Sequence, residues 1–185
     1  MKIEELNLAG AFYIEPKLFP DDRGYFYEFF NQQAFHNETG VKFQAVQFNR
    51  SKSSYGVLRG LHFQQDPKAQ AKLVSVTSGE IQDVIVDLRK GSPTFGKSRS
   101  IILSSQNKNQ LFVPKGFAHG FLVLSNEAEI FYAIDDFYSP QHEGGIMYND
   151  PLIDVEWQME SNQLIMSDKD LVYKSIEDTT LNFNY

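Results

Sequence analysis

Short segments in which apolar and polar residues alternate recur along most of this chain, and they limit its fold more than any other feature. The segments are rich in Val, Ile, Phe and Tyr, and glycine, proline, asparagine or serine separates them. A period of two is typical of β-strands with one buried face, whereas helical periodicity is rare here. The candidate strands are Ala11–Glu15, Tyr25–Phe30, Phe43–Ser51, Gly56–Phe63, Lys72–Thr77, Glu80–Asp87, Ser98–Ser104, Gln110–Val113, Gly116–Leu124 and Glu129–Ile134. This pattern predicts a mainly β sandwich or jelly roll, with short helices at Asn31–His36 and Ser167–Lys174.

Length and composition limit the organisation of the chain. With 185 residues, 42% of them hydrophobic, it is long enough for one well-filled core and short for two. We therefore expect a single domain over residues 1–185. The sequence contains no cysteine, which excludes disulfides, thiolate zinc sites and a thiol nucleophile.

The net charge and the first residues of the sequence limit the classes of binding partner and the cellular location that we expect. The net charge of -7 argues against nucleic-acid binding, which depends on neutralising many phosphates, but it permits one small anion at a locally basic pocket. Acidic residues occur at the start, where a secretory signal would need an apolar run. No later run approaches the roughly 20 apolar residues that cross a bilayer. We expect a cytoplasmic protein with no nucleic-acid and no membrane partner.

Strand parity places several polar side chains among residues of the core. Alternate side chains of a strand point to opposite faces, so His119 faces the same way as Phe117 and Phe121. The same reasoning predicts an inward orientation for Tyr132, Gln47, Asn49 and Glu28. Several polar groups are thus expected to meet inside one barrel.

Three cations lie in the otherwise apolar stretch between Gly56 and Val76. Arg59, His62 and Lys72 would be costly to bury there unless polar or anionic groups meet them. Arg59 and His62 have opposite parity, so a regular strand would send them to different faces. Either Gly60 marks a bulge that redirects one of them, or the two residues serve different sites.

Most familiar site chemistries find no support in the sequence. The four histidines show no close metal-ligand spacing, and there is no Gly-x-Ser-x-Gly elbow or glycine-rich phosphate loop. Ser51, Ser53 and Ser54 look like turn residues. General acid–base chemistry remains, with His62 as the natural base and a lysine to stabilise developing negative charge.

Taken singly, most candidate residues have an ordinary structural explanation. His119 could be a hydrogen-bonded core histidine and Tyr132 a core aromatic residue. Asp170 follows Ser167 at capping-box spacing, which would only stabilise the start of a helix. The joint placement of these residues on segments that a barrel would bring together is what favours a site.

Several longer runs carry a resemblance to a known family. They are DRGYFYE (22–28), QFNRS (47–51), GVLRGLHFQ (56–64), QAKLV (70–74), DLRKGSPTFG (87–96) and PKGFAHGF (114–121). Together with Tyr132, Glu143, Asn149 to Pro151 and Ser167 to Asp170, these runs closely resemble the dTDP-4-dehydrorhamnose 3,5-epimerase family. The resemblance covers nearly the whole chain in order, without a large gap.

The resemblance implies a cupin-type jelly roll that uses neither metal nor cofactor. It implies a homodimer in which N-terminal strands cross between subunits. The implied reaction inverts C3 and C5 of dTDP-4-dehydro-6-deoxy-D-glucose, a dTDP-4-keto-6-deoxy sugar, to give dTDP-4-dehydro-L-rhamnose for dTDP-L-rhamnose synthesis. By the same resemblance, His62 abstracts the proton and is oriented by Asp170.

Further roles follow from the matched positions. Tyr132 would deliver a proton from the opposite side, and Lys72 would stabilise the enolate oxygen. The implied substrate-binding residues are Arg23, Glu28, Gln47, Asn49, Arg59, His119, Tyr138, Glu143 and Lys169, with Arg23 and Glu28 reaching the site from the partner subunit if strands are exchanged.

Two alternatives remain open at this point. One is an epimerase that inverts a single carbon, or a ketoisomerase, on a dTDP-4-keto sugar. The other is a cupin that binds a nucleotide sugar without acting on it. The presence of Tyr132 together with His62 and Lys72 argues against the second alternative, because a binding module needs no proton donor opposite its base.

Overall fold

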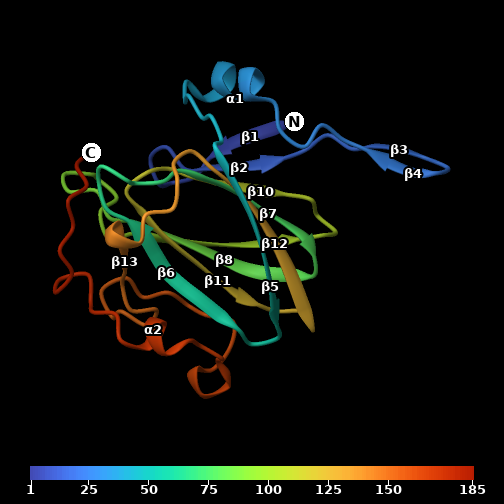
Figure 1. Ribbon diagram of the computed structural model, residues 1–185. Helices are drawn as coiled ribbons and strands as arrows, with labels where there is room; N and C mark the ends of the chain where they lie inside the picture. The colour runs from blue at the N-terminus through green and yellow to red at the C-terminus, as the bar shows by residue number, and fades with distance from the viewer.

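Two antiparallel β-sheets face each other in the computed structural model, which describes all residues from 1 to 185 (Figure 1). The six-stranded sheet has the order β1 (Lys2–Glu5), β2 (Phe12–Glu15), β10 (Gln110–Val113), β7 (Lys72–Ser78), β12 (Glu127–Ile134) and β5 (Gln47–Ser54). The five-stranded sheet has the order β13 (Glu143–Gly145), β6 (Leu58–Gln64), β11 (Phe117–Val123), β8 (Glu80–Asp87) and β9 (Ser98–Ser104). The predicted mainly β jelly roll is confirmed.

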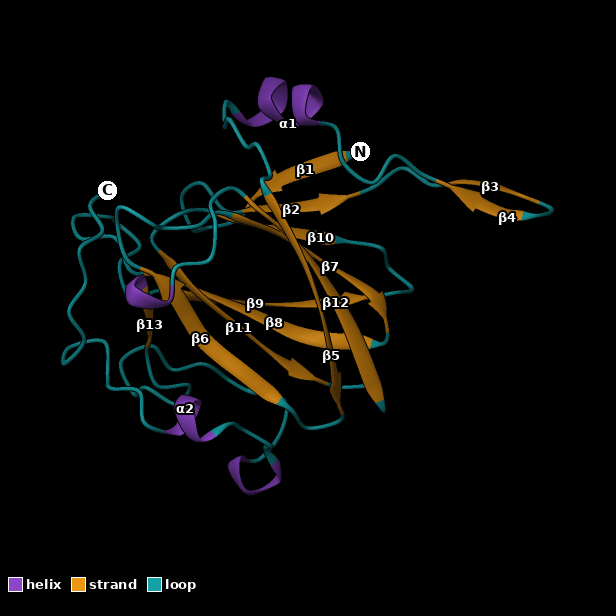
Figure 2. Ribbon diagram, viewed as in Figure 1, coloured by secondary structure: helices purple, strands orange, loops and turns teal.

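Few residues are helical (Figure 2). The helices are α1 (Gln32–Thr39), α2 (Asp168–Leu171) and the 3-10 turns η1 (Pro140–His142) and η2 (Ser161–Gln163). The Asn31 side chain caps α1 by accepting a hydrogen bond from the backbone N–H of Ala34. None of these helices is long and apolar enough to cross a membrane.

The main core lies between the two sheets, where inward-facing side chains from both meet. Val74 and Ile130 come from the six-stranded sheet, and Ile85 and Phe121 from the five-stranded one. Tyr132 packs against the same cluster. The parity that put His119 and Tyr132 on the inward face is therefore correct, since both share the parity of these core residues.

Separate apolar clusters cover the outer faces of the sheets. Phe35 of α1 packs with Phe112 of β10 over the six-stranded sheet. Ile176 and Phe183, from the C-terminal segment, pack with Val84 of β8 over the five-stranded sheet. The C-terminal segment also contains α2, so this packing holds α2 against the barrel next to β6.

Strand β6 contains a bulge at Gly60. Across the β6–β11 pair, His62 lies opposite His119 and Arg59 lies opposite Phe121, so β6 has one residue more than β11 between these pairs. Gly60 has φ +135°, and a Cβ there would lie 2.5 Å from the Cα of Gly120. Because directly opposed residues share a face, the bulge turns both Arg59 and His62 inward despite their opposite parity.

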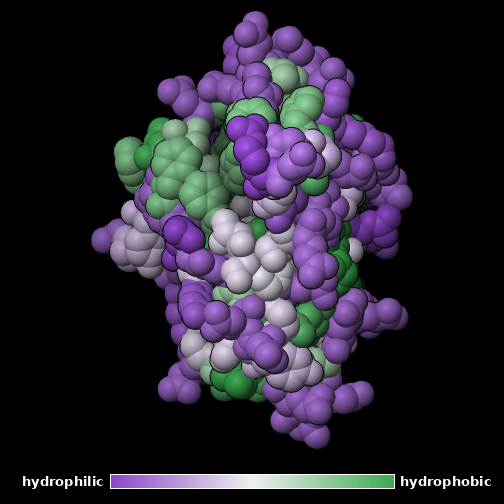
Figure 3. Space-filling view, turned by 90° about the vertical axis from the view of Figure 1, so that its right-hand side faces the viewer, coloured by the Kyte–Doolittle hydropathy of each residue, from purple (hydrophilic) through white to green (hydrophobic).

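A two-stranded hairpin, β3 (Phe19–Asp21) and β4 (Gly24–Phe26), stands apart from both sheets. It projects beyond the barrel (Figure 1). Its aromatic side chains are exposed, among them Phe26 at 70% and Tyr25 at 54%. Figure 3 views the molecule from the side toward which the hairpin projects and shows hydrophobic surface beside hydrophilic surface there.

Several boundaries differ from the sequence predictions. The strand expected at Tyr25–Phe30 ends at Phe26, and Glu28 is exposed, so its predicted inward orientation is wrong. The strand expected at Phe43–Ser51 runs instead from Gln47 to Ser54, and the interpretation of its serines as turn residues is wrong. Helix α2 is shorter than the predicted Ser167–Lys174. Strands β1, β3 and β13 were not predicted. β3 and β13 have only three residues each, too few to show a periodicity, whereas β1 has four, as many as the predicted β2.

Candidate active site

A pocket of about 270 Å³ lies between the two sheets. Strands β5, β7 and β12 form one wall, and β6 and β11 form the other. The predicted site residues in its lining are Asn49, Arg59, His62, Lys72, His119, Tyr132, Tyr138 and Glu143. The jelly roll thus brings together residues that lie far apart in the sequence.

Strand register explains why these side chains meet. His62 lies directly opposite His119 across β6 and β11. On the other sheet, Lys72 lies opposite Ile134, which is two residues from Tyr132 and shares its face. The base candidate and the acid candidate therefore come from facing sheets, which places them on different walls of the pocket.

His62 and Asp170 form a hydrogen-bonded pair. The distance from His62 Nε2 to Asp170 Oδ1 is 2.6 Å, and the aspartate side chain is 4% exposed while the histidine side chain is 29% exposed. Burial alone would raise the pKa of Asp170, but the hydrogen bond and charge of His62, together with Ser167, hold this pKa below its usual range. The ionised carboxylate accepts the Nε2 proton, which leaves Nδ1 as the basic nitrogen of the imidazole.

Local structure positions Asp170. The Ser167 hydroxyl accepts a hydrogen bond from the backbone N–H of Asp170 at 3.3 Å and caps the short helix α2. The sequence interpretation of Asp170 as part of a helix start is therefore correct, and it does not compete with a role beside His62. The Tyr173 ring approaches the imidazole edge-on, with centroids 5.7 Å apart.

Tyr132 is held by one hydrogen bond. Its hydroxyl lies 3.2 Å from Ser51 Oγ on β5. Burial raises the pKa of Tyr132 well above its usual value, so the phenol keeps its proton at neutral pH. A neutral phenol on the wall opposite His62 is suited to donate a proton.

Lys72 brings a positive charge into the pocket. Burial lowers the pKa of its ammonium group to about 8, while the charges of Asp83 and Glu143 act in the opposite direction. At neutral pH most of the lysine is still protonated. A charge that is already in place and poorly solvated stabilises negative charge that develops beside it.

A second histidine–aspartate pair lies deeper between the sheets. His119 Nε2 is 2.5 Å from Asp83 Oδ1, and both side chains are buried, at 5% and 0% exposure. Asp83 Oδ2 has no hydrogen-bond partner. Sequence reasoning missed Asp83, although a carboxylate with the parity of Ile81 and Ile85 in an apolar strand was a signal that could have found it.

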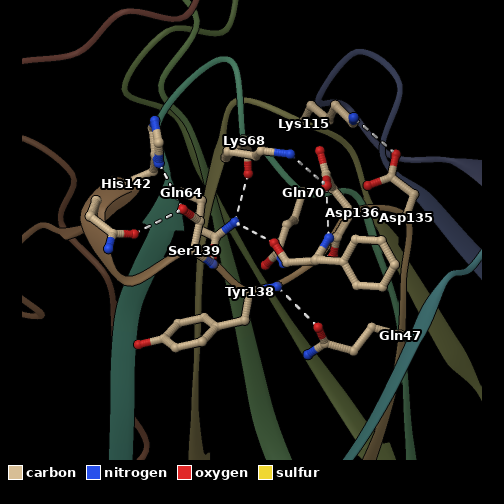
Figure 4. Close-up of polar contacts among 12 residues, drawn as sticks. Gln47, Gln64, Lys68, Gln70, Lys115, Asp135, Asp136, Tyr138, Ser139 and His142 are labelled. Atoms are coloured by element: carbon tan, nitrogen blue, oxygen red, sulfur yellow. Dashed lines mark hydrogen bonds and ion pairs between the residues drawn. The ribbon is translucent and has the colours of Figure 1, made fainter.

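A network of amides and charges forms the rim. Figure 4 shows Gln64, whose amide nitrogen donates to the carbonyl of Lys68 and whose oxygen accepts from the backbone N–H of Ser139. Next to it, the backbone N–H of Tyr138 donates to Gln47 Oε1 at 3.0 Å (Figure 4). Gln47 in turn donates to Asn49 at 3.0 Å, so it supports the lining without belonging to it.

Opposite charges meet at the same rim. Lys169 Nζ lies 2.5 Å from Glu143 Oε1, and the Tyr138 hydroxyl donates to the other carboxylate oxygen at 3.0 Å. Burial would raise the pKa of Glu143, but these two hydrogen bonds hold it below its usual range. The rim therefore presents an ionised carboxylate already paired with a lysine.

Arg59 reaches the pocket from the residue before the bulge. Its Nε donates to Ser53 Oγ at 3.1 Å, and the residue remains exposed. The hydrogen bond fixes one edge of the guanidinium and leaves the other nitrogens available. Such a fork is suited to binding two phosphate oxygens.

Arg23 and Glu28 lie outside the pocket. The Arg23 side chain is 89% exposed on the β3–β4 hairpin and pairs with Asp21 at 2.6 Å. Glu28 accepts a hydrogen bond from Asn31 at 3.1 Å. Within one chain these two residues do not join the other site candidates.

No group of three or more histidine, aspartate or glutamate side chains is arranged to hold a metal ion. The side chains that line the pocket include acid–base groups and cations. They are a histidine oriented by a carboxylate, a neutral phenol on the facing sheet and a half-buried lysine.

Comparisons with known proteins agree with this inventory. The sequence profile of a protein family described as dTDP-4-dehydrorhamnose 3,5-epimerase matches residues 5–178. A dTDP-4-dehydrorhamnose 3,5-epimerase of Shigella flexneri is 49% identical over 171 residues, which cover 92% of this chain and 93% of the relative. A similar enzyme of Pseudomonas aeruginosa is 47% identical over 178 residues, covering 96% of this chain and 97% of the relative.

A solved structure shows the same fold with a nucleotide sugar bound. It is the dTDP-6-deoxy-D-glucose-3,5-epimerase of Legionella pneumophila Philadelphia 1 in complex with dTDP-4-keto-L-rhamnose. The similarity has a TM-score of 0.94 at 43% identity and covers 100% of this chain and 98% of that one.

Proposed function

The chain belongs to the dTDP-4-dehydrorhamnose 3,5-epimerase family, and we propose that His62, Tyr132 and Lys72 carry out the family's reaction in it. The enzyme is an isomerase that converts dTDP-4-dehydro-6-deoxy-D-glucose to dTDP-4-dehydro-L-rhamnose. The observation that carries the assignment of roles is the pairing of His62 with buried Asp170 on one wall of the pocket, with the neutral phenol of Tyr132 on the facing sheet.

The chemistry needs a base and an acid on different faces of the sugar. C3 and C5 both flank the C4 ketone, so removal of a proton from either carbon gives an enolate. In our proposal His62 Nδ1 takes that proton, and Tyr132 returns one to the opposite face, which inverts the centre. The ammonium of Lys72 stabilises the enolate oxygen, a contribution on the order of 10²–10³ in rate by analogy with oxyanion-hole donors.

The remaining predicted residues are proposed to hold the nucleotide. Arg59 binds the diphosphate, and Asn49 and His119 contact the substrate from the two walls of the pocket. The rim group of Gln47, Tyr138, Glu143 and Lys169 closes around the nucleotide end, where the exposed Tyr138 ring offers a surface for stacking on the base. These assignments rest on pocket geometry and on the resemblance of the motifs.

Arg23 and Glu28 are proposed to complete the site of a neighbouring subunit in a homodimer. Their distance from the pocket of their own chain supports this, as does the exposed aromatic surface of the projecting hairpin. The dimer, the single domain over residues 1–185 with exchanged N-terminal strands, and the cytoplasmic location are parts of the proposal. Sedimentation and cell fractionation would test the assembly and the location.

A mixed-dimer experiment tests the exchange of residues between subunits. Arg23→Ala and His62→Ala chains are each prepared, unfolded together and refolded as a mixture. If Arg23 of the partner subunit serves the site, the mixed dimer contains one complete site and activity returns. If Arg23 acts within its own chain, the mixture stays as inactive as its components.

The catalytic assignment is tested by deuterium exchange. The protein is incubated with dTDP-4-keto-6-deoxyglucose in D₂O, and the label is mapped by NMR. Label and inversion at both C3 and C5 support the double epimerase, while label at a single carbon supports a single-carbon epimerase. A ketoisomerase would yield a product with the carbonyl at another carbon, and a binding cupin would give no label while still binding dTDP. His62→Ala should abolish exchange at both carbons.

A further inference from the structure

Strand β5 lies at the edge of the six-stranded sheet, and its inward face is a row of small polar side chains. Every second residue of the strand belongs to this row, which consists of Gln47, Asn49, Ser51 and Ser53. The opposite face carries Arg50 and Lys52, which pair with Glu129 and Glu127 at the surface. Of this row Ser53 is buried, Gln47 and Ser51 are half-buried and Asn49 is exposed, so the row lies on the open side of the site rather than in the apolar core.

Each member of the row contacts another residue of the site. Ser53 accepts from Arg59, Gln47 accepts from the backbone of Tyr138, and Gln47 donates to Asn49. Ser51 contacts the hydroxyl of Tyr132 at 3.2 Å, which is the only hydrogen bond of that phenol. Of these contacts, the one at Ser51 involves an atom that our proposed function places in the reaction.

We propose that Ser51 is a positioning residue that acts through Tyr132 and decides whether an enolate is inverted or returned to its original configuration. The proposal rests on the proposed function above, in which Tyr132 is the acid. Ser51 donates its hydroxyl proton to the phenol oxygen, which leaves the phenol proton free to point to the substrate. After the transfer the same hydrogen bond stabilises the phenolate oxygen.

Several charges around Tyr132 show why this hydrogen bond matters. Burial disfavours the phenolate most strongly, and the charge of Asp83 adds to this effect. The Ser51 hydroxyl and the charge of Arg59 act in the opposite direction, with Ser51 the larger. Without Ser51 the phenol would hold its proton more tightly, and the protonated His62 would return its proton to the face from which it came.

The consequence is a partition that can be measured within one sample. An enolate that is reprotonated by His62, after the proton on His62 has exchanged with D₂O, gives starting material that carries deuterium without inversion. An enolate that is protonated by Tyr132 gives the inverted product. The ratio of exchange with retention to inversion depends on the relative rates of the two steps, and not on how much of the enzyme is folded.

The test compares Ser51→Ala with Ser51→Thr, Tyr132→Phe and Ser54→Ala. Ser54 lies on the same strand but has the parity of the solvent-facing side, and its side chain makes no hydrogen bond in the structure, so Ser54→Ala controls for a general weakening of β5. We expect Ser51→Ala to raise the ratio of retention to inversion by about 10- to 100-fold, the range for a lost hydrogen bond to a charged group. The KM should change little. Ser51→Thr should restore the wild-type ratio, because it keeps the hydroxyl.

A double variant separates a role through Tyr132 from an independent one. If Ser51 acts through the phenol, Ser51→Ala combined with Tyr132→Phe should give the same ratio as Tyr132→Phe alone. Equal ratios for wild type and Ser51→Ala would overturn the inference, as would a change that Ser51→Thr does not restore. If instead the wild-type enzyme fails to invert either carbon, the proposed function itself is wrong, and the two failures are therefore distinguishable.

Discussion

The charge of Lys72 is expected to limit the enzyme at alkaline pH, and Asp83 is expected to set where this limit falls. Lys72 must be protonated to stabilise an enolate, and burial has lowered its pKa to about 8. Activity should therefore decline as the pH rises through 8, because the lysine loses its charge. Asp83 opposes the effect of burial more than any other group, so without its charge the pKa of Lys72 would fall further.

The size of the shift can be estimated for Asp83→Asn. Two unit charges about 4 Å apart interact by about 1 kcal/mol in water and about 4 kcal/mol at the effective dielectric constant of a protein surface. Lys72 and Asp83 form no direct ion pair, so the lower end of this range applies to them. One pKa unit corresponds to about 1.4 kcal/mol, so the lower end of this range moves the pKa of Lys72 by roughly one unit. At pH 8 the protonated fraction would fall from about one half to about one tenth, which slows the reaction about fivefold.

The assay is kcat/KM for inversion, measured from pH 6 to pH 10. Asparagine keeps the shape of Asp83 and an oxygen that can accept from His119, so the alkaline limb should move to lower pH while the rate at pH 6 changes little. Glu143→Gln should move the limb less, because Glu143 is the smaller influence on the pKa of Lys72. In Lys72→Arg the remaining kcat/KM should show no decline at alkaline pH, since arginine stays charged. An unchanged limb in Asp83→Asn, or a limb that persists in Lys72→Arg, would refute the reasoning.

Three further predictions concern the bulge, a buried ion pair and metals. Gly60→Ala should lower the free energy of unfolding by more than about 3 kcal/mol. Gly24→Ala should cost only the backbone strain of about 1–3 kcal/mol, because Gly24 has the same φ of +135° but nothing lies within 4 Å of the added carbon. If urea unfolding gave equal costs for the two variants, the clash of a Cβ at Gly60 with Gly120 would be contradicted. Arg89→Met should cost about 3 kcal/mol, because it removes the counter-ion of the fully buried Asp87 carboxylate, which keeps the hydrogen bonds from Ser92 and Thr94. The loss should shrink at acidic pH, where protonation removes the charge of Asp87. A chelator such as EDTA should leave deuterium exchange unchanged, and loss of exchange that added metal restores would overturn the acid–base proposal.

Much of the fold and the outline of the site were predictable from the sequence. Alternation marked most strands, and parity correctly placed His119 and Tyr132 inside. The opposite parity of Arg59 and His62 pointed to a bulge at Gly60, and the register shift between β6 and β11 confirms it. These features are local, so they can be read from neighbouring residues.

What the sequence could not supply depends on register and on distant contacts. Ser51 was interpreted as a turn residue, yet it lies in β5 and contacts Tyr132, 81 residues later in the sequence. Which residues oppose each other across two strands is decided by pairing register, which alternation within one strand does not reveal. Asp83 was overlooked although its parity within β8 marked it as inward-facing, and only its pairing with His119 on the neighbouring strand depended on register. Glu28 was misplaced because its strand ends before it.

The pairing of His62 with Asp170 also bears on how the protein comes into being. The two residues are separated by 108 positions, and the aspartate lies in a segment that packs onto the barrel from the end of the chain. A ribosome therefore makes the base long before it makes the carboxylate that orients it. Chains released early would contain most of the barrel and the lysine, but their histidine would have no aspartate to fix its orientation. Appearance of activity during translation would then report that synthesis has passed residue 170 and that the final segment has docked.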